Sequence, residues 1–389
     1  MRSLAWATAP VHGSGVRFPR LVSVSLAAVV VLAMACGNAS TEAPVADATP
    51  DASTGADGSE SADGTAAAGD GGTSTDGATC TTCARDWSAH PPVAQISAAS
   101  ELWVLSDIHG DYSAFTNLLL GAKLIAAAPA TPAAVKWTGG TAYLVVVGDL
   151  IDKGPDAVDV VRLAAALQVA ASAAGGGVVV TMGNHEAEFL ADPLNSKASG
   201  ASGFDPELQS AGLTPAATAA GQNDVGAFLR NLPFAASVSG WFFAHAGKTD
   251  GRTIAKLSSD LQAGVDANGF GAPVLSAVDS ILEVKLNAKA PQWWDATGDA
   301  QALLTQWTSA LGVKHLVMGH QPGGVGFADL TTRAADKMIQ KYGGLLFLVD
   351  TGLSVGTDGT GGAFLHVRSP GTASESFEEV LPSGAPKPL

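Results

Sequence analysis

Short apolar runs alternate with longer segments of helical spacing along residues 101–368 of this chain. The short runs are rich in valine, leucine and phenylalanine, which predicts strands at 102–106, 142–148, 177–183, 241–247, 315–319, 344–350 and 363–368. Between them, apolar residues three and four apart predict helices at 112–126, 156–175, 224–232, 273–288 and 299–311. This alternation is typical of an α/β fold, in which helices cover a β-sheet.

Two further stretches break this pattern. Residues 187–222 are rich in alanine, serine and glycine, and we interpret them as an insertion in a domain that spans 91–380. Residues 37–79 carry eight acidic residues, no lysine or arginine and almost no large apolar side chain. Such a composition cannot bury enough surface to offset the entropy of ordering. We therefore predict a disordered acidic linker over 37–90.

The N-terminal segment resembles a bacterial export signal. An apolar run of about 15 residues follows Arg20, which is shorter than the ~20 residues that span a bilayer. It ends at Ala35 and Cys36, which resembles a lipoprotein lipobox, although Ala33 stands where that motif prefers leucine. We expect a signal peptide over 1–36 and a protein exported to the cell envelope, anchored to a membrane only by a lipid on Cys36. An ordinary cleaved signal and an uncleaved anchor are the alternatives.

Charge and cysteine content narrow the possible partners. Three arginines in 1–35 and eight acids in 37–79 leave −10 of the total charge of −15 for the remaining residues. A negative domain does not attract nucleic acid, and we expect none as a partner.

Cys80 and Cys83 form a C-x-x-C pair without the second pair of a zinc site. In an exported protein, a local disulfide or two idle thiols is expected.

Polar residues that can bind metal ions follow five of the predicted strands. In open α/β sheets, sites form at the carboxyl ends of strands. The residues in question are Asp107, His109, Asp149, Asp152, Asn184, His185, His245 and His320. Their oxygen and nitrogen donors suit divalent ions such as Mn, Fe or Zn. Each alone has an ordinary explanation as a helix cap or a structural histidine, but four of the eight histidines fall at such strand ends.

The motifs at these strand ends resemble those of the calcineurin-like metallophosphoesterases. SDIHGD, GDLIDKG, GNHE, AHAG and MGHQP occur in this order between Ser106 and Pro322. Pro322 stands where many phosphoesterases have a second histidine, which resembles the Ser/Thr protein phosphatase branch. The surroundings of GDLIDKG, together with VDTGLS, are similar to the bacterial Shewanella-like protein phosphatases. The resemblance implies two mixed β-sheets packed as a sandwich and flanked by α-helices.

The resemblance also implies a site for two metal ions. The first ion would be bound by Asp107, His109 and Asp149. The second would share Asp149 and be bound also by Asn184, His245 and His320. A bridging position suits an ionised carboxylate, because it accepts from two sides.

The remaining roles concern the substrate. By resemblance, His185 would protonate the leaving group, and Asp152 would hydrogen-bond His185 and favour its protonated form. Lys153 stands where the phosphatases usually have an arginine that binds phosphate, and a lysine offers a point charge in place of a bidentate fork. Arg252 is the arginine between His245 and His320, and we predict that Lys153 and Arg252 bind the substrate phosphate.

We therefore expect a metallophosphatase with two divalent metal ions, which hydrolyses a phosphorylated protein or a small phosphate ester. A dinucleoside-polyphosphate hydrolase or a phosphodiesterase of the same fold is the alternative, and the G-H-x-P ending argues mildly against the phosphodiesterase branches. A binding module that has lost turnover is a more remote alternative, because the ligand set and His185 are intact.

Overall fold

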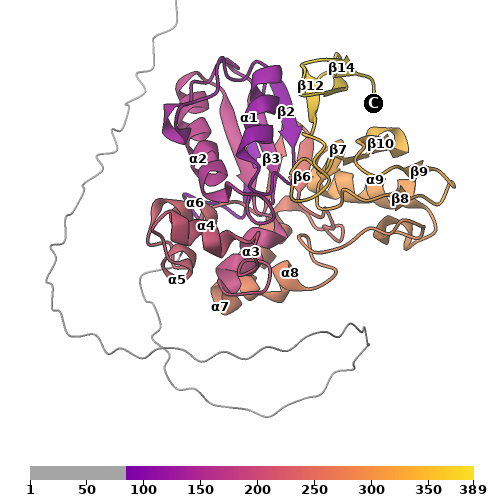
Figure 1. Cartoon of the computed structure of the whole chain (residues 1–389). Coiled ribbons are helices and arrows are strands. Elements are labelled where there is room, and N and C mark those ends of the chain that lie inside the picture. The colour runs from indigo at the N-terminus through magenta and orange to yellow at the C-terminus, as the bar shows by residue number, and fades with distance from the viewer. Residues whose placement is uncertain (1–84) are drawn as a thin grey trace, which may run out of the picture. The chain divides into compact units, whose positions relative to one another are not determined.

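Two six-stranded β-sheets form the centre of the folded part of the chain, and helices flank them (Figure 1). The computed structural model describes residues 85–389. One sheet has the order β1 (Val93–Ile96), β5 (Ala235–Val238), β6 (Trp241–Ala244), β7 (His315–Met318), β11 (Leu346–Leu348) and β10 (Ile339–Lys341). The other has the order β14 (Pro386–Lys387), β13 (Ser376–Val380), β12 (Phe364–Arg368), β2 (Glu101–Leu105), β3 (Tyr143–Val147) and β4 (Gly177–Thr181). A small hairpin joins β8 (Val325–Gly326) and β9 (Thr332–Arg333).

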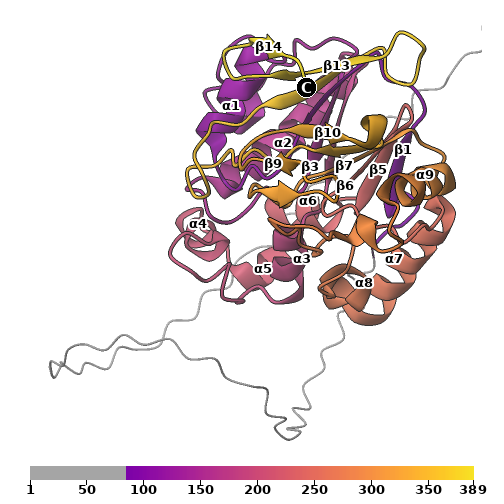
Figure 2. The ribbon, with the colours of Figure 1, turned by 90° about the vertical axis from the view of Figure 1, so that its right-hand side faces the viewer.

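The helices lie on the outer faces and at one end of the sheets. Helices α1 (Tyr112–Gly121) and α2 (Ala157–Ala173) connect β2, β3 and β4 and cover their outer face (Figure 1). A second group gathers below the sheets in both views (Figures 1 and 2) and comprises α3 (Asn184–Ala191), α4 (Phe204–Ser210), α5 (Pro215–Ala219), α7 (Ile254–Asn268) and α8 (Pro273–Ser276). Helices α6 (Asp224–Arg230) and α9 (Ala300–Leu311) complete the set.

Alternating side chains of the strands build two apolar cores. Leu102 and Val104 of β2 pack between the sheets, in one cluster with Phe243 of β6 and Val317 of β7. Trp103 and Leu105 point the other way and pack in the cluster that includes α1 and α2. Successive side chains of a strand point to opposite faces, so both faces of β2 are buried. The predicted α/β fold and the sandwich of two mixed sheets are confirmed.

Parallel pairing brings several strand ends to one edge. Strands β2, β3 and β4 run parallel in one sheet, and β6, β7 and β11 run parallel in the other. Parallel neighbours end at the same edge of a sheet. Residues that follow these strands therefore come together, although they lie far apart along the chain.

Some predicted elements differ from the structure. The helix predicted at 273–288 is wrong beyond Ser276, where α8 ends. The cause is local, because Ser280 Oγ donates to the Leu275 carbonyl and accepts from the N–H groups of Leu282 and Glu283. Such side-chain bonds compete with helical ones. Helix α7 was not predicted, although Thr253 caps it.

The segment 187–222, interpreted as an insertion, is helical and packed. It contains the end of α3 and all of α4 and α5. Phe204 and Leu208 of α4 are fully buried. This segment is therefore part of the folded domain.

The folded part begins before residue 91. The guanidinium of Arg85 donates to the carbonyls of Arg230 and Leu232 at 2.9 and 2.8 Å and lies over the ring of Trp87. The predictions for the signal peptide, for Cys36, for Cys80 and Cys83 and for the linker up to residue 84 lie outside the described residues. Among the helices that are described, none is long and apolar enough to cross a membrane.

Candidate metal centre

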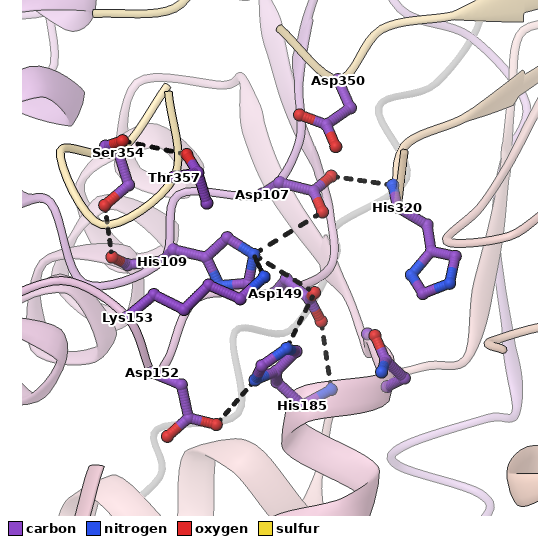
Figure 3. A network of polar contacts seen from close by, with 12 residues as sticks. Asp107, His109, Asp149, Asp152, Lys153, His185, His320, Asp350, Ser354 and Thr357 are labelled. Atoms are coloured by element: carbon purple, nitrogen blue, oxygen red, sulfur yellow. Dashed lines mark hydrogen bonds and ion pairs between the residues drawn. The ribbon is translucent and has the colours of Figure 1, made fainter. Parts of the chain in front are cut away.

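The predicted ligands meet at the edge where the parallel strands of both sheets end. Asp107 and His109 follow β2, Asp149 follows β3, and Asn184 opens α3 after β4. From the other sheet, His245 follows β6 and His320 follows β7. Figure 3 shows the side chains of Asp107, His109, Asp149 and His185 turned toward one another. The site therefore lies where the carboxyl-terminal edges of the two sheets meet.

The backbone at the site is strained. Asp107, His109, Asp149 and His320 all have positive φ, at 54°, 44°, 53° and 66°. Non-glycine residues rarely adopt this conformation, which costs about 1–3 kcal/mol each and clusters at functional sites. The backbone conformation of four of the six predicted metal ligands therefore destabilises the fold.

Two glycines let the loops close around Asp149. A Cβ on Gly183 would lie 2.1 Å from Asp149 Oδ1, and a Cβ on Gly148 would lie 2.6 Å from His245 Nδ1. Gly148 also has a φ of 79°. Since a real Cβ cannot approach so closely, the sequence needs glycine at both positions.

Asp149 is the centre of the cluster. Its Oδ2 lies 3.3 Å from Nε2 of His245 and 3.6 Å from Nε2 of His109, and the side chain is buried. It belongs to two groups whose donor atoms all lie within 4.8 Å of one another, one with His109 and His185 and one with His245 and His320. Burial alone would raise the pKa of Asp149, but His245 and His185 outweigh it and hold this pKa well below its usual range. A carboxylate shared by two groups can bridge two cations.

Backbone carbonyls fix the tautomers of two histidines. Nδ1 of His109 lies 3.0 Å from the Ile151 carbonyl, and Nδ1 of His245 lies 2.9 Å from the Val147 carbonyl. An N–H must donate there, so in the neutral form of each ring the lone pair is on Nε2, the atom that faces Asp149. Burial also lowers the pKa of His109 well below its usual value, so its imidazole is in the neutral form that binds metals.

Three possible metal ligands surround Nε2 of His245. Its Nε2 lies 3.1 Å from Asn184 Oδ1, 3.1 Å from Nδ1 of His320 and 3.3 Å from Asp149 Oδ2. Burial would lower the pKa of His245, but the charges of Asp149 and Asp107 raise it to about 10. An environment that holds a proton so firmly on a buried histidine favours a cation. Nitrogen and oxygen donors without sulfur fit Mn, Fe or Zn.

Asp107 links the two sheets. Its Oδ2 accepts from the backbone N–H of His320 at 3.0 Å, and its Oδ1 lies 3.9 Å from Nε2 of His109 (Figure 3). Burial raises its pKa, which a bound cation would reverse. All six predicted ligands therefore meet in one cluster, and their chemistry fits divalent metal ions.

His185 and Asp152 form a hydrogen-bonded pair next to this cluster. Nδ1 of His185 lies 2.7 Å from Asp152 Oδ2, and its Nε2 lies 4.0 Å from Asp149 Oδ2. The other oxygen of Asp152 accepts from the N–H of Phe204 at 2.8 Å. Burial would lower the pKa of His185, but the charge of Asp149 and the bond to Asp152 raise it above its usual value. The pair can therefore hold a proton at the edge of the metal cluster.

The two predicted phosphate ligands lie in different places. Lys153 lines the cavity at the metal centre, and its ammonium donates to Nε2 of His109 at 2.9 Å. Arg252 does not line this cavity and binds the Thr249 carbonyl, Asp250 and Asp260. Arg252 is thus engaged elsewhere, and the structure gives its predicted role no support.

Glu186 supports the site and was not predicted. Its carboxylate accepts from four backbone N–H groups, those of Asp149, Leu150, Ile151 and Gly183, at 2.7 to 3.2 Å. This one side chain therefore fixes the turn that carries Asp149. In the sequence, Glu186 is visible as the final residue of the GNHE motif. Its role was not evident there, because most of its partners are distant along the chain.

Replacing Glu186 by glutamine is expected to lower the free energy of unfolding by about 2–4 kcal/mol, because the new amide group faces backbone donors that lose their acceptor. Urea unfolding of the two proteins measures the difference. Glu101→Gln is the control, since Glu101 has a single 3.5 Å ion pair with His366. Equal stability of the Glu186→Gln variant and the wild type would contradict this role.

The fold and the buried cluster define a metallophosphoesterase. The sequence matches the family model of calcineurin-like phosphoesterases over residues 101–343, which is more than half of the chain. The chain therefore belongs to the calcineurin-like phosphoesterase family, and it is a phosphoesterase hydrolase of a family that uses divalent metals.

Individual proteins resemble this chain in sequence or in fold. An uncharacterised protein of Schizosaccharomyces pombe is 26% identical over 274 residues, which is 67% of this chain and 75% of that protein. The cold-active protein-tyrosine phosphatase of a Shewanella species has a similar fold, with a TM-score of 0.56 at 19% identity over 76% of this chain and 83% of that one. A Saccharomyces cerevisiae protein serine/threonine phosphatase gives 0.50 at 15% identity over 75% and 84%. The predicted resemblance to Shewanella-like phosphatases is confirmed at the level of the fold.

Proposed function

We propose that this protein is a phosphomonoesterase that works with two divalent metal ions bound at Asp107, His109, Asp149, Asn184, His245 and His320. The observation that carries the proposal is the position of Asp149, whose Oδ2 lies 3.6 Å from Nε2 of His109 in the first ligand set and 3.3 Å from Nε2 of His245 in the second. These residues would hold divalent ions, which would polarise the phosphoryl group and lower the pKa of a water so that it can attack as hydroxide. Mn, Fe and Zn all suit this donor set.

The chain's own residues would handle the leaving group. His185 holds a proton at the edge of the cluster and can give it to the departing oxygen of the ester. Asp152 keeps its ring in place through the 2.7 Å bond to Nδ1. Phe204 fixes Asp152 in turn, because its N–H occupies the second carboxylate oxygen.

Lys153 would neutralise the substrate phosphate. Lys153→Ala is expected to lower kcat/KM for a phosphomonoester about tenfold, mainly through KM, since a charge-assisted hydrogen bond contributes about 1.5–3 kcal/mol. Lys153→Arg keeps the charge and should retain most of the activity. Steady-state kinetics of the three proteins measure the effect, and unchanged constants for Lys153→Ala would rule out this role.

The class of substrate is tested by a panel. The metal-loaded protein is expected to hydrolyse p-nitrophenyl phosphate and phosphopeptides with phosphoserine or phosphotyrosine faster than bis-p-nitrophenyl phosphate or diadenosine tetraphosphate. Preference for either of the last two would instead identify a phosphodiesterase or a dinucleoside-polyphosphate hydrolase. Binding of metal without hydrolysis of any compound would identify a binding module.

We also infer that the enzyme acts in the cell envelope, held by a lipid on Cys36. The inference rests on the apolar run and the lipobox-like Ala35–Cys36. In bacteria that express the full chain, Cys36→Ala is expected to abolish labelling by a fatty-acid analogue and release the protein from the membrane fraction. Equal labelling of the variant and the wild type would contradict the inference.

A further inference from the structure

The cavity at the metal centre is lined by more lysines than the proposed function uses. It has a volume of about 580 Å³, within the ~300–1,000 Å³ of small-molecule sites. Three lysines line it, in a chain whose net charge is −15. They come from separate parts of the fold, with Lys153 after β3, Lys197 between α3 and α4, and Lys285 after α8.

Lys153 and Lys197 are linked to different ligands of the metal centre. Lys153 is in contact with His109, a predicted ligand of the first metal ion. Lys197 is tied to the second group of ligands, because it binds Glu188 at 2.6 Å and Glu188 accepts from Asn184 Nδ2 at 3.4 Å. Lys285 lines the cavity together with His320, a ligand of the same group.

Both lysines can still bind an anion. Lys285 is exposed and forms no ion pair within residues 85–389. Lys197 has one carboxylate partner, but an ammonium carries three donors. The carboxylates that line the cavity are Asp149 and Asp152, and both are engaged, with the metal cluster and with His185. Glu188 is therefore the carboxylate that competes with a ligand for Lys197, whereas Lys285 has no carboxylate partner among the described residues.

We propose that Lys197 and Lys285 form a second anion-binding subsite, which takes a carboxylate or phosphate group adjacent to the phosphomonoester of the substrate. This inference rests on the proposed function, because it assumes that the phosphomonoester itself binds at the metal centre. It assigns a substrate class, namely phosphate esters that carry a second negative group. It also gives segment 187–222 a role, since this segment supplies Lys197 to the cavity wall.

The test is a binding experiment with two matched pairs of ligands. Calorimetry is performed on the full-length, metal-loaded protein carrying His185→Asn, which spares the ligands from hydrolysis. The first pair is 3-phosphoglycerate and glycerol 3-phosphate, which differ by a carboxylate against a hydroxymethyl group. The second pair is two phosphoserine peptides with glutamate or glutamine beside the phosphoserine. The same ligands are then titrated into the Lys285→Met protein, the Lys197→Met, Lys285→Met double variant and a Lys136→Met control.

At least one pair is expected to show about tenfold tighter binding of the more acidic ligand, as charge-assisted hydrogen bonds predict. Preference within the first pair alone identifies a small phosphorylated acid, and preference within the second alone identifies an acidic phosphoprotein segment. Lys285→Met should reduce the preference about threefold and the double variant should abolish it, whereas Lys136→Met, an exposed lysine outside the cavity, should retain it.

Two results would overturn the proposal. One is equal binding of both members of both pairs, and the other is an undiminished preference in the folded Lys285→Met protein. Because Lys285 is exposed and without an ion pair in the described part of the chain, its loss does not threaten folding. The proposed function is judged separately by turnover of p-nitrophenyl phosphate with His185 present, so failure of one is not mistaken for failure of the other.

Discussion

Replacing Asp149 by asparagine is expected to lower kcat/KM for a phosphomonoester by about 10³-fold or more and to remove at least one bound metal ion. The side chain is the one shared by both groups of donors, and a neutral amide offers one oxygen where the carboxylate offers two. The loss corresponds to about 4 kcal/mol of transition-state stabilisation. Metal ions typically stabilise the charge that develops in a transition state by an amount of this size.

The fold itself should survive this change. Asparagine has nearly the same shape as aspartate, and its Oδ1 can still accept from the backbone N–H of His185. Asp156→Asn is the matched control, because Asp156 follows in the same loop but is exposed and makes no capping bond. Kinetics, metal analysis and thermal unfolding of the three proteins give the answer. Full activity of the folded Asp149→Asn protein would show that a bridging carboxylate is not required.

Replacing His185 by asparagine has the second-largest expected effect. Loss of a general acid costs about 10²–10⁴-fold in rate, and the cost depends on the leaving group. An alkyl phosphate, whose alkoxide needs a proton, should lose far more than p-nitrophenyl phosphate, whose phenolate leaves without one. Equal losses for the two substrates would mean that His185 has a structural role.

The pH dependence of turnover gives an independent readout of this pair. The pKa of His185 is raised in the folded protein, so the protonated form persists to a higher pH than in a free imidazole and is lost as the pH rises through that pKa. Asp152→Asn removes the charge that Asp152 contributes and should move the alkaline limb of kcat to lower pH by about one unit, or ~1.4 kcal/mol. Asp159→Asn, an exposed change in the first turn of α2, should leave the limb in place. An unmoved limb in Asp152→Asn would exclude its action through His185.

The parts of the site that could be predicted are those set by local pattern. The apolar runs before Asp107, Asp149 and His245 predicted strands, and the strands end within two residues of these positions. Because parallel strands end at a common edge, the order of strands and polar residues was enough to expect one cluster. The motifs then assigned a role to each ligand.

The parts that were missed depend on partners distant in the sequence. Glu186 contacts backbone groups about 36 residues away, and Phe204 reaches Asp152 across 52 residues. No periodicity in the chain encodes such contacts. The contacts of Arg252 were missed for the same reason, since the position of an arginine between two motif histidines does not reveal that Asp250 and Asp260 bind it.

Metal content and activity, measured together on the same sample, test the central claim most directly. We predict two equivalents of divalent ion per chain in the active protein, loss of hydrolysis of p-nitrophenyl phosphate when a chelator removes them, and recovery when Mn, Fe or Zn is returned. Undiminished hydrolysis by protein shown to be free of metal would contradict the account.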